Sequence, residues 1–154
     1  MPESFATKFD RLKFNLFPAY RGTGAKVIYI ADDYHEIRVK IPLTWRTRNY
    51  VGTIYGGSMY GGIDPIYMLM LINNLGKNYI IWDKAATIRF KRPGKETLFA
   101  DFLLTQKELD EIREILETKK SVDRVYNVEL KDKNGKVHAI VEKTLYIAKK
   151  VGKI

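Results

Sequence analysis

The sequence of 154 residues contains no cysteine, which excludes disulfide bonds, thiolate metal sites and a cysteine nucleophile. The N-terminal stretch MPESFATKFDRLKF carries charges every few residues and lacks the apolar segment of a secretory signal. The longest apolar stretch, residues 63–72, is interrupted by Asp64 and Pro65 and is shorter than the about 20 residues of a membrane-spanning helix. We therefore expect a cytoplasmic protein without a membrane span.

Several motifs of cofactor and metal chemistry are also missing. The chain has no Gly-x-Gly-x-x-Gly, no Walker loop and no Gly-x-Ser-x-Gly elbow. Its histidines, His35 and His138, lie far apart in the sequence and have no companion at metal-ligand spacing. We expect neither a metal ion nor a cofactor.

Positive charge is in excess, with 27 basic and 18 acidic residues and a net charge of +9. Such a charge attracts nucleic acid, an anionic membrane surface or the phosphates of a coenzyme, and by itself it does not choose among them. The basic residues are interleaved with acids, as in DEIREILETKK, and only TIRFKR combines them with an aromatic residue. We expect no specific nucleic-acid binding, and a solvated surface is the simpler interpretation.

Helical periodicity is clear in two segments. Within residues 3–17 the spacing of Phe5, Phe9, Leu12 and Leu16 predicts one apolar face of a covering helix that stops at Pro18. Residues 106–118 form a second amphipathic pattern that begins with Thr105 and Glu108 at capping-box spacing.

Alternating apolar and polar residues predict six strands, the last two joined at Asn134-Gly135, which favours a type I′ turn. The strands cover residues 26–31, 35–43, 84–91, 96–104, 122–131 and 136–148. Residues 57–76 leave almost no polar face, which indicates an enclosed helix capped by Gly76. Together these patterns predict an α+β hotdog fold, in which a curved antiparallel sheet wraps around one long central helix, as a single domain over residues 1–154.

Glycines mark the entrance to the central helix. Gly56 and Gly57 precede it, and Gly61 and Gly62 lie at its start, where each costs about 1 kcal/mol relative to alanine. Such glycines indicate a close approach of the backbone to another group. Free amides at a helix start also bind a carbonyl oxygen that gains negative charge.

The run Asn49-x-x-Gly52-Thr53-x-Tyr55-Gly56-Gly57, followed by Asp64, resembles the Asn-x-x-Gly-Thr-x-His-Gly-Gly stretch of the phenylacetate-type and related acyl-CoA thioesterases. The resemblance is strongest over residues 46–93. It implies that Asp64 acts as general base or nucleophile, that the Gly57 amide binds the oxyanion and that Asn49 orients substrate or water. It also implies that the site forms between two subunits, in a homodimer or in a tetramer made of two such dimers. Relative to the shortest members of the family, residues 105–119 look like an inserted helix, and residues 1–20 are the N-terminal covering helix that the periodicity predicts.

Two positions depart from the family pattern. Tyr55 replaces the histidine and does not titrate near neutrality. Asp83 stands where relatives carry serine or threonine, and a second carboxylate near Asp64 suits an acid and base pair. Besides these catalytic candidates, the expected substrate-binding residues, with the phosphates of coenzyme A as one target, are Tyr55, Gly56, Ser58, Arg89 and Lys91.

Structural interpretations of the same residues stay open. Asp64 followed by Pro65 is also a common helix start, and a helix that begins near Ser58 is instead kinked at Pro65. Asn49 is also a frequent turn-former. The resemblance implies a thioester hydrolase acting on acyl-CoA or acyl-carrier thioesters, with a non-catalytic hotdog protein that binds acyl groups or acyl-CoA as the alternative.

Overall fold

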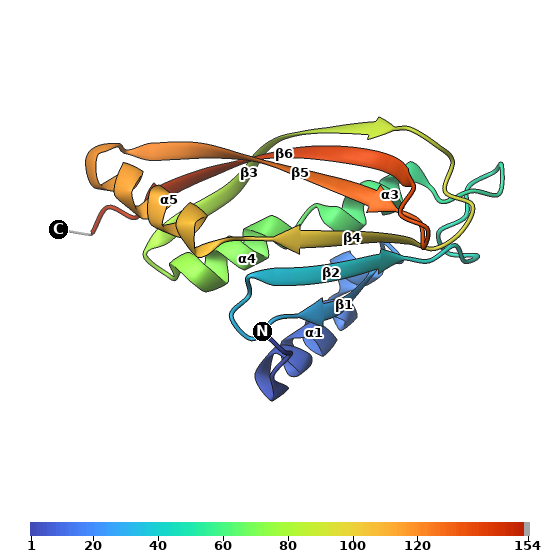
Figure 1. The fold of residues 1–154 in the computed structure, drawn as a ribbon, viewed down its shortest axis with the longest axis horizontal. Helices are drawn as coiled ribbons and strands as arrows, with labels where there is room; N and C mark the ends of the chain where they lie inside the picture. The colour runs from blue at the N-terminus through green and yellow to red at the C-terminus, as the bar shows by residue number, and fades with distance from the viewer. Residues whose placement is uncertain (153–154) are drawn as a thin grey trace.

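A six-stranded antiparallel sheet forms the frame of the protein in the computed structural model, which describes residues 1–152. The order across the sheet is β1-β2-β4-β5-β6-β3, so that β1 and β3 are the edge strands (Figure 1). The strands are β1 (Lys26–Ile30), β2 (Glu36–Ile41), β3 (Tyr79–Phe90), β4 (Leu98–Leu103), β5 (Ser121–Lys131) and β6 (Val137–Lys149). All six predicted strands are confirmed, and β3 begins earlier in the chain than its alternation indicates.

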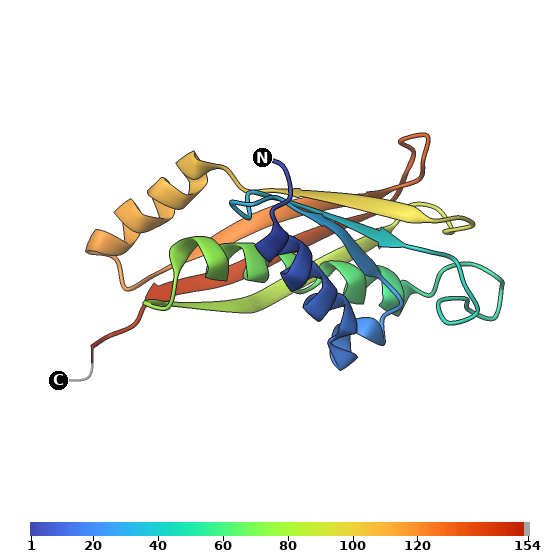
Figure 2. The ribbon, with the colours of Figure 1, turned by 90° about the horizontal axis from the view of Figure 1, so that it is seen from below.

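The central helices and α1 lie on one face of this sheet, and α5 lies at one end of it (Figure 2). The helices are α1 (Phe5–Leu16), α2 (Pro18–Arg21), α3 (Gly56–Ile63), α4 (Ile66–Leu75) and α5 (Gln106–Thr118). The side chains of Ile63, Ile66 and Met70 are buried between the central helices and the sheet. This arrangement confirms the α+β hotdog fold. Within the described range, no helix is long and apolar enough to cross a membrane.

The central helix consists of two consecutive segments, α3 and α4, that meet at Asp64 and Pro65. Proline has no N–H to donate to the carbonyl of Gly61, and its ring conflicts with the preceding turn, so the helix breaks at the kink that Pro65 predicts. Gly76 ends α4 with a φ of 89°, which confirms the predicted cap and agrees with the low cost of this conformation for glycine.

Close packing of α3 against the chain before β1 explains why Gly61 and Gly62 are glycines. A Cβ atom on Gly61 would lie 2.8 Å from Cγ2 of Thr23, and one on Gly62 would lie 2.6 Å from Cβ of Ala25. The close approach indicated by these glycines is therefore made between α3 and the chain that leads into β1.

The apolar face of α1 points away from the sheet, contrary to the predicted covering contact. Phe5 is 88% exposed, and Phe9, Leu12 and Leu16 are more than half exposed. The helix contacts the domain through its opposite side, where Thr7 is buried and the Asn15 amide binds β1. The spacing correctly predicts that the four side chains share a face, but it does not determine which way that face points.

The hairpin between β5 and β6 differs from the predicted type I′ turn. That turn needs positive φ at two residues, whereas Gly135 has φ 81° and Asn134 is not in the positive region. The Asp132 carboxylate accepts hydrogen bonds from the backbone N–H groups of Asn134 and Lys136. These two bonds stabilise a longer loop, so the side chain of Asp132 decides the conformation of this turn.

Helix α5 begins as its capping residues predict, with one difference. The Thr105 hydroxyl accepts a hydrogen bond from the Glu108 N–H at 3.1 Å. The Glu108 carboxylate binds Arg124 and Tyr126 on β5 and not the helix start. Glu108, which we expected to complete the capping box, therefore connects α5 to the sheet by hydrogen bonds.

Candidate functional site

Asp64 lies at the break between α3 and α4, where it is the C-cap residue of α3. Oδ1 of its carboxylate accepts hydrogen bonds from the Tyr60 hydroxyl at 2.9 Å and from the Lys143 ammonium. The following helix, α4, has Pro65 as its N-cap residue and no side-chain capping bond. The carboxylate therefore does not cap a helix, and its side chain remains 42% exposed.

Lys143, on β6, is the site residue that the sequence interpretation missed. Its side chain is only 1% exposed, and its ammonium lies 2.7 Å from Oδ1 of Asp83 and 3.3 Å from the Tyr60 hydroxyl. The signal was present in the alternation of β6, because Lys143 occupies an inward position between Val141 and Leu145. A lysine at an inward position of an apolar alternation needs charged partners, and here they are Asp64 and Asp83.

Asp83 reaches the same ammonium from β3. It stands at an irregularity in the β3–β6 pairing, between Asp83 and Ala85, and such bulges redirect side chains. The structure thus brings the two predicted carboxylates together, but with a cation bound to both. We call Tyr60, Asp64, Asp83 and Lys143 the Lys143 cluster.

The contacts of the cluster favour a charged Lys143 and a neutral Tyr60. Burial lowers the pKa of Lys143, but hydrogen bonds from its ammonium to Asp64 and Asp83 outweigh this effect and raise the pKa above its ordinary value. Burial raises the pKa of Tyr60, and its hydrogen bond to Asp64 raises it further. At neutral pH the cluster therefore has an ammonium and a neutral phenol beside the carboxyl groups of Asp64 and Asp83.

The predicted oxyanion site lies at the start of α3. The N–H groups of Ser58 and Met59 both donate to the Tyr55 carbonyl. Over residues 1–152 no backbone hydrogen bond is formed by the N–H of Gly56 or Gly57, which agrees with the unpaired amides of a first helical turn. Gly57 is exposed, whereas Ser58 is buried inside the helix. The structure thus separates Ser58 from the surface where a substrate would bind.

The ring of Tyr55 packs against this helix start. A Cβ atom on Gly57 would lie 2.3 Å from Cε1 of Tyr55, and one on Gly56 would lie 2.9 Å from Cζ of Phe90. Both glycines therefore permit aromatic rings to approach the backbone that carries the free amides.

The side chain of Asn49 forms hydrogen bonds within its own turn. Its Oδ1 accepts hydrogen bonds from the N–H groups of Val51 and Thr53, and its Nδ2 donates to Oγ1 of Thr53 at 2.9 Å. These are the contacts of the turn-forming interpretation. Asn49 nevertheless borders a pocket of about 390 Å³ next to the start of α3, whose other lining residues are Thr53, Ile54, Gly56, Met59 and residues 90–94.

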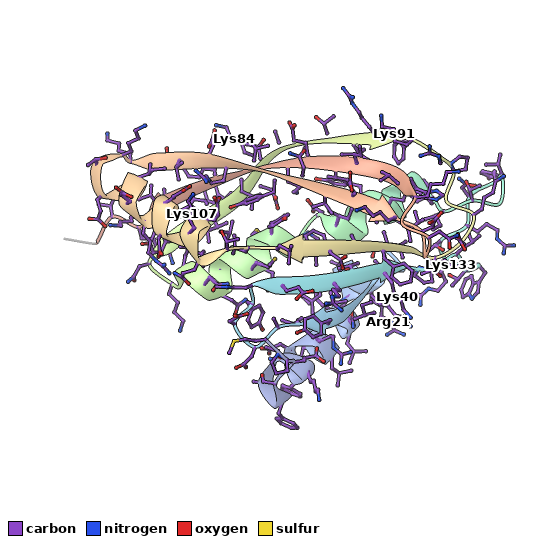
Figure 3. The ribbon with its side chains drawn as sticks, in the orientation of Figure 1. Arg21, Lys40, Lys84, Lys91, Lys107 and Lys133 are labelled. Carbon is purple, nitrogen blue, oxygen red and sulfur yellow. The ribbon has the colours of Figure 1, made fainter. Side chains whose placement is uncertain are left out.

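The predicted site residues fall into two groups within one chain. Asp64 and Asp83 meet at Lys143, whereas Asn49, Gly56 and Lys91 border the pocket at the other end of α3. Gly57 and Asp64 stand at opposite ends of α3, which at 1.5 Å per residue places their backbones about 10 Å apart. Arg89 and Lys91 are exposed at the end of β3 that borders the pocket, where Figure 3 labels Lys91.

A metal-binding cluster is not found in the described residues. No group of three or more histidine, aspartate or glutamate side chains in residues 1–152 is arranged to hold a metal ion. The basic residues labelled in Figure 3 come from several elements and are spread over the molecule.

Comparisons with known proteins agree with this fold. The model of a family described as a domain of unknown function (DUF4442) matches residues 6–147. No curated protein matches the chain. A Pseudomonas aeruginosa protein of unknown function, described as a probable thioesterase, superimposes with a TM-score of 0.82 at 17% identity, covering 97% of this chain and 99% of that one.

Two further solved structures are similar. A thioesterase from Haemophilus influenzae has a TM-score of 0.70 at 14% identity and covers 97% of this chain and 95% of its own. A putative thioesterase from Shewanella oneidensis has a TM-score of 0.69 at 19% identity and covers 93% of this chain and 96% of its own. At these identities the likeness concerns the fold.

Proposed function

Because the chain belongs to the DUF4442 family and shares the hotdog fold with proteins described as thioesterases, we propose that it hydrolyses thioesters of an acyl group with coenzyme A or an acyl carrier. The observation that carries the proposal is the state of the Asp64 carboxylate. Tyr60 and Lys143 both bind Oδ1, and within residues 1–152 no hydrogen bond reaches Oδ2. A partly exposed carboxylate with one oxygen fixed and the other open suits a general base or a nucleophile.

The chemistry follows two routes from this carboxylate. As a base, Asp64 takes a proton from water while the water oxygen bonds to the acyl carbon. The carbon–sulfur bond then breaks, its electron pair leaves with sulfur, and the thiolate takes the proton from Asp64. As a nucleophile, Asp64 displaces the thiolate itself and forms an anhydride that water hydrolyses. Both routes place negative charge on the carbonyl oxygen, where the unpaired amide at Gly57 binds it.

A second copy of the chain is required for these groups to meet. A carbonyl oxygen bound at Gly57 lies about 3 Å from its amide, whereas Asp64 of the same chain is about 10 Å along α3. We propose that Gly57 and Asn49 of one subunit face Asp64 of the other in a homodimer. The long edge strand β3 is the surface we assign to this contact, because no strand within residues 1–152 pairs with its outer side.

Basic residues lie where the coenzyme A or acyl-carrier part of the substrate would bind. Arg89 and Lys91 are exposed beside the pocket that contains Gly56 and Phe90, and coenzyme A and the phosphopantetheine arm of carriers both bear phosphate. We propose that these residues bind that phosphate, while Tyr55 and Phe90 contact the apolar part next to the thioester. A substrate of this kind agrees with the expected cytoplasmic location.

An assay of hydrolysis tests the mechanism. Wild type and Asp64→Asn are incubated with acyl-CoA esters of several chain lengths, and free thiol is measured. We expect Asp64→Asn to lose at least about 100-fold in kcat/KM, since it removes the base without removing volume. Asp101→Asn, an exposed aspartate on β4, is the control and should retain activity. Full activity in Asp64→Asn would refute the assigned role.

A non-catalytic acyl or acyl-CoA binding role is the second candidate, and one contact favours it. The ring of Tyr55 stands where the thioesterase pattern has histidine, and it lies against Gly57, which narrows access to the amide. This role predicts saturable binding of a thioester by calorimetry without release of thiol. Tyr55→His should then create or raise turnover, and rapid hydrolysis by the wild type would exclude the role.

A further inference from the structure

The burial of Lys143 needs an explanation beyond stability. A buried ammonium loses its hydration, and ion pairs in such places are often no more stabilising than apolar side chains of similar size. Lys143 occupies an inward position between Val141 and Leu145, where methionine would also fit the alternation. Its contacts are with the two carboxylates and the phenol of the candidate site.

The arrangement of these contacts is asymmetric. Lys143 binds Oδ1 of Asp64 and Oδ1 of Asp83, and Tyr60 also donates to Oδ1 of Asp64. Both donors thus select the same oxygen of Asp64. Without the ammonium, two carboxylates would face one another, and one of such a pair binds a proton more readily than an isolated acid.

The other titratable groups near Lys143 either have their own partners or face solvent. On β5, Tyr126 stands opposite Lys143 in the strand register, but its hydroxyl donates to Glu108. On β3, the register partner is Ala86, and the neighbouring Lys84 pairs with Asp123. On β6 itself, Glu142 is exposed on the other side of the strand. Tyr60 and the two aspartates are therefore the groups that govern the charge around Lys143.

We propose that Lys143 is a positioning residue of the hydrolytic site: it offsets the charge of Asp83 and fixes Asp64 by Oδ1, so that Asp64 presents its Oδ2 to the thioester. This inference rests on the proposed function. In this inference Asp83 is the second carboxylate that binds the Lys143 ammonium. The acid and base pair expected from the sequence is then a pair of carboxylates bridged by a cation.

The first experiment replaces the charge by an apolar chain of similar length. In Lys143→Met we expect kcat to fall about 100-fold with KM changed little, because the substrate still binds but the base is displaced and partly protonated. The acidic limb of the pH profile of kcat/KM should move upward by about one pH unit. Lys149→Met, which removes a surface lysine of the same strand that is paired with Glu117, is the matched control and should leave the profile unchanged.

A double variant separates charge from packing. Lys143→Met combined with Asp83→Asn removes the ammonium and the carboxylate that it offsets, so the acidic limb should return toward its wild-type position. A Lys143→Met profile that matches wild type, or a limb that stays shifted in the double variant, would overturn the proposal.

Two further measurements keep the test independent of folding and of activity. If Lys143→Met does not fold, Lys143→Arg is used, because it keeps the positive charge on a bulkier guanidinium group. Its kcat should fall while the acidic limb of the pH profile stays in place. A shifted acidic limb in Lys143→Arg would contradict the inference. Titration of the aspartate carboxyl carbons by 13C NMR in wild type and Lys143→Met reads the same coupling without a substrate. If the protein hydrolyses no thioester, this titration still decides whether Lys143 controls the ionisation of the pair.

Discussion

The two edge strands of the sheet differ in whether the rest of the chain covers their backbone groups. At one edge, β1 is a short strand, and the Asn15 amide of α1 donates to the Val27 carbonyl and accepts from the Val27 N–H, both at 2.8 Å. Glu3 accepts a further bond from the N–H of Ile30. At the other edge, β3 is long, and residues 82–87 are all exposed. Unpaired edges invite association, so the chain closes one edge itself and leaves the other open.

The open edge is also the one that carries the chemistry. Asp83, Arg89 and Lys91 belong to β3 or follow it directly, and Asp83 connects β3 to the Lys143 cluster. The closed edge carries α1 and none of the predicted site residues. In the homodimer that we propose, a partner at β3 would complete the sheet and the site together.

The largest expected effect comes from mixing two inactive variants. Asp64→Asn and Gly57→Val should each be inactive as homodimers, because the second places a side chain in the space of the Tyr55 ring and over the amide. After mixing and refolding, about a quarter of wild-type activity should return, since random pairing makes half the dimers mixed and one of two sites in each is complete. The assay is thiol release after mixing. No recovery, in samples shown to exchange subunits, would place the whole site within one chain.

The next effect concerns association. Thr87→Lys adds a charge to β3 beside Lys84 and Arg89, and like charges within an interface cost several kcal/mol. We expect the dimer dissociation constant to rise about 100-fold, measured by sedimentation equilibrium. Ile28→Lys, the corresponding change on β1, is the control and should leave the dissociation constant unchanged. Equal effects at both edges would remove the distinction between them.

A smaller effect, on stability, is expected when the hydrogen bonds between α1 and the edge strand β1 are removed. Asn15→Leu removes both hydrogen bonds to Val27 and leaves its backbone groups without a partner, which costs about 1–3 kcal/mol of unfolding free energy. Chemical denaturation measures this loss, and the Val27 amide should exchange its hydrogen faster. Asn73→Leu, whose exposed amide bonds only to the Leu69 carbonyl in the described residues, should change stability by less than about 0.5 kcal/mol.

The smallest effect is a pH dependence at the same closed edge. Burial raises the pKa of Glu3, but hydrogen bonds from Arg11 and from the Ile30 N–H outweigh it, so the pKa is lowered below 4.5. Because the folded state holds this carboxylate ionised, its contribution is present above pH 4.5 and is lost as pH falls through the lowered pKa. Glu3→Gln should therefore be less stable than wild type at neutral pH and approach it in acid. Glu114→Gln, on the exposed side of α5, should show no such convergence.

Local patterns were sufficient for much of the fold. The alternation of β2 and β6, the Thr105 cap of α5 and the positive φ at Gly76 involve residues close together in the chain, where backbone geometry limits the choices. The break at Pro65 also follows from a local property, the missing N–H of proline. The hairpin at Asn134 was predicted correctly, but its type I′ turn was wrong because the Asp132 side chain binds the turn, which a dipeptide rule does not include.

Local patterns in the sequence are enough to predict which segments are helices and strands, which glycines lie at the entrance to α3 and that Asp64 follows them. Contacts between distant elements, in contrast, turn the apolar face of α1 outward and place Lys143 between Asp64 and Asp83. The difference lies in the range of the interactions. Periodicity and capping act over a few residues, whereas the partner of a buried charge is chosen by packing between elements far apart in the chain.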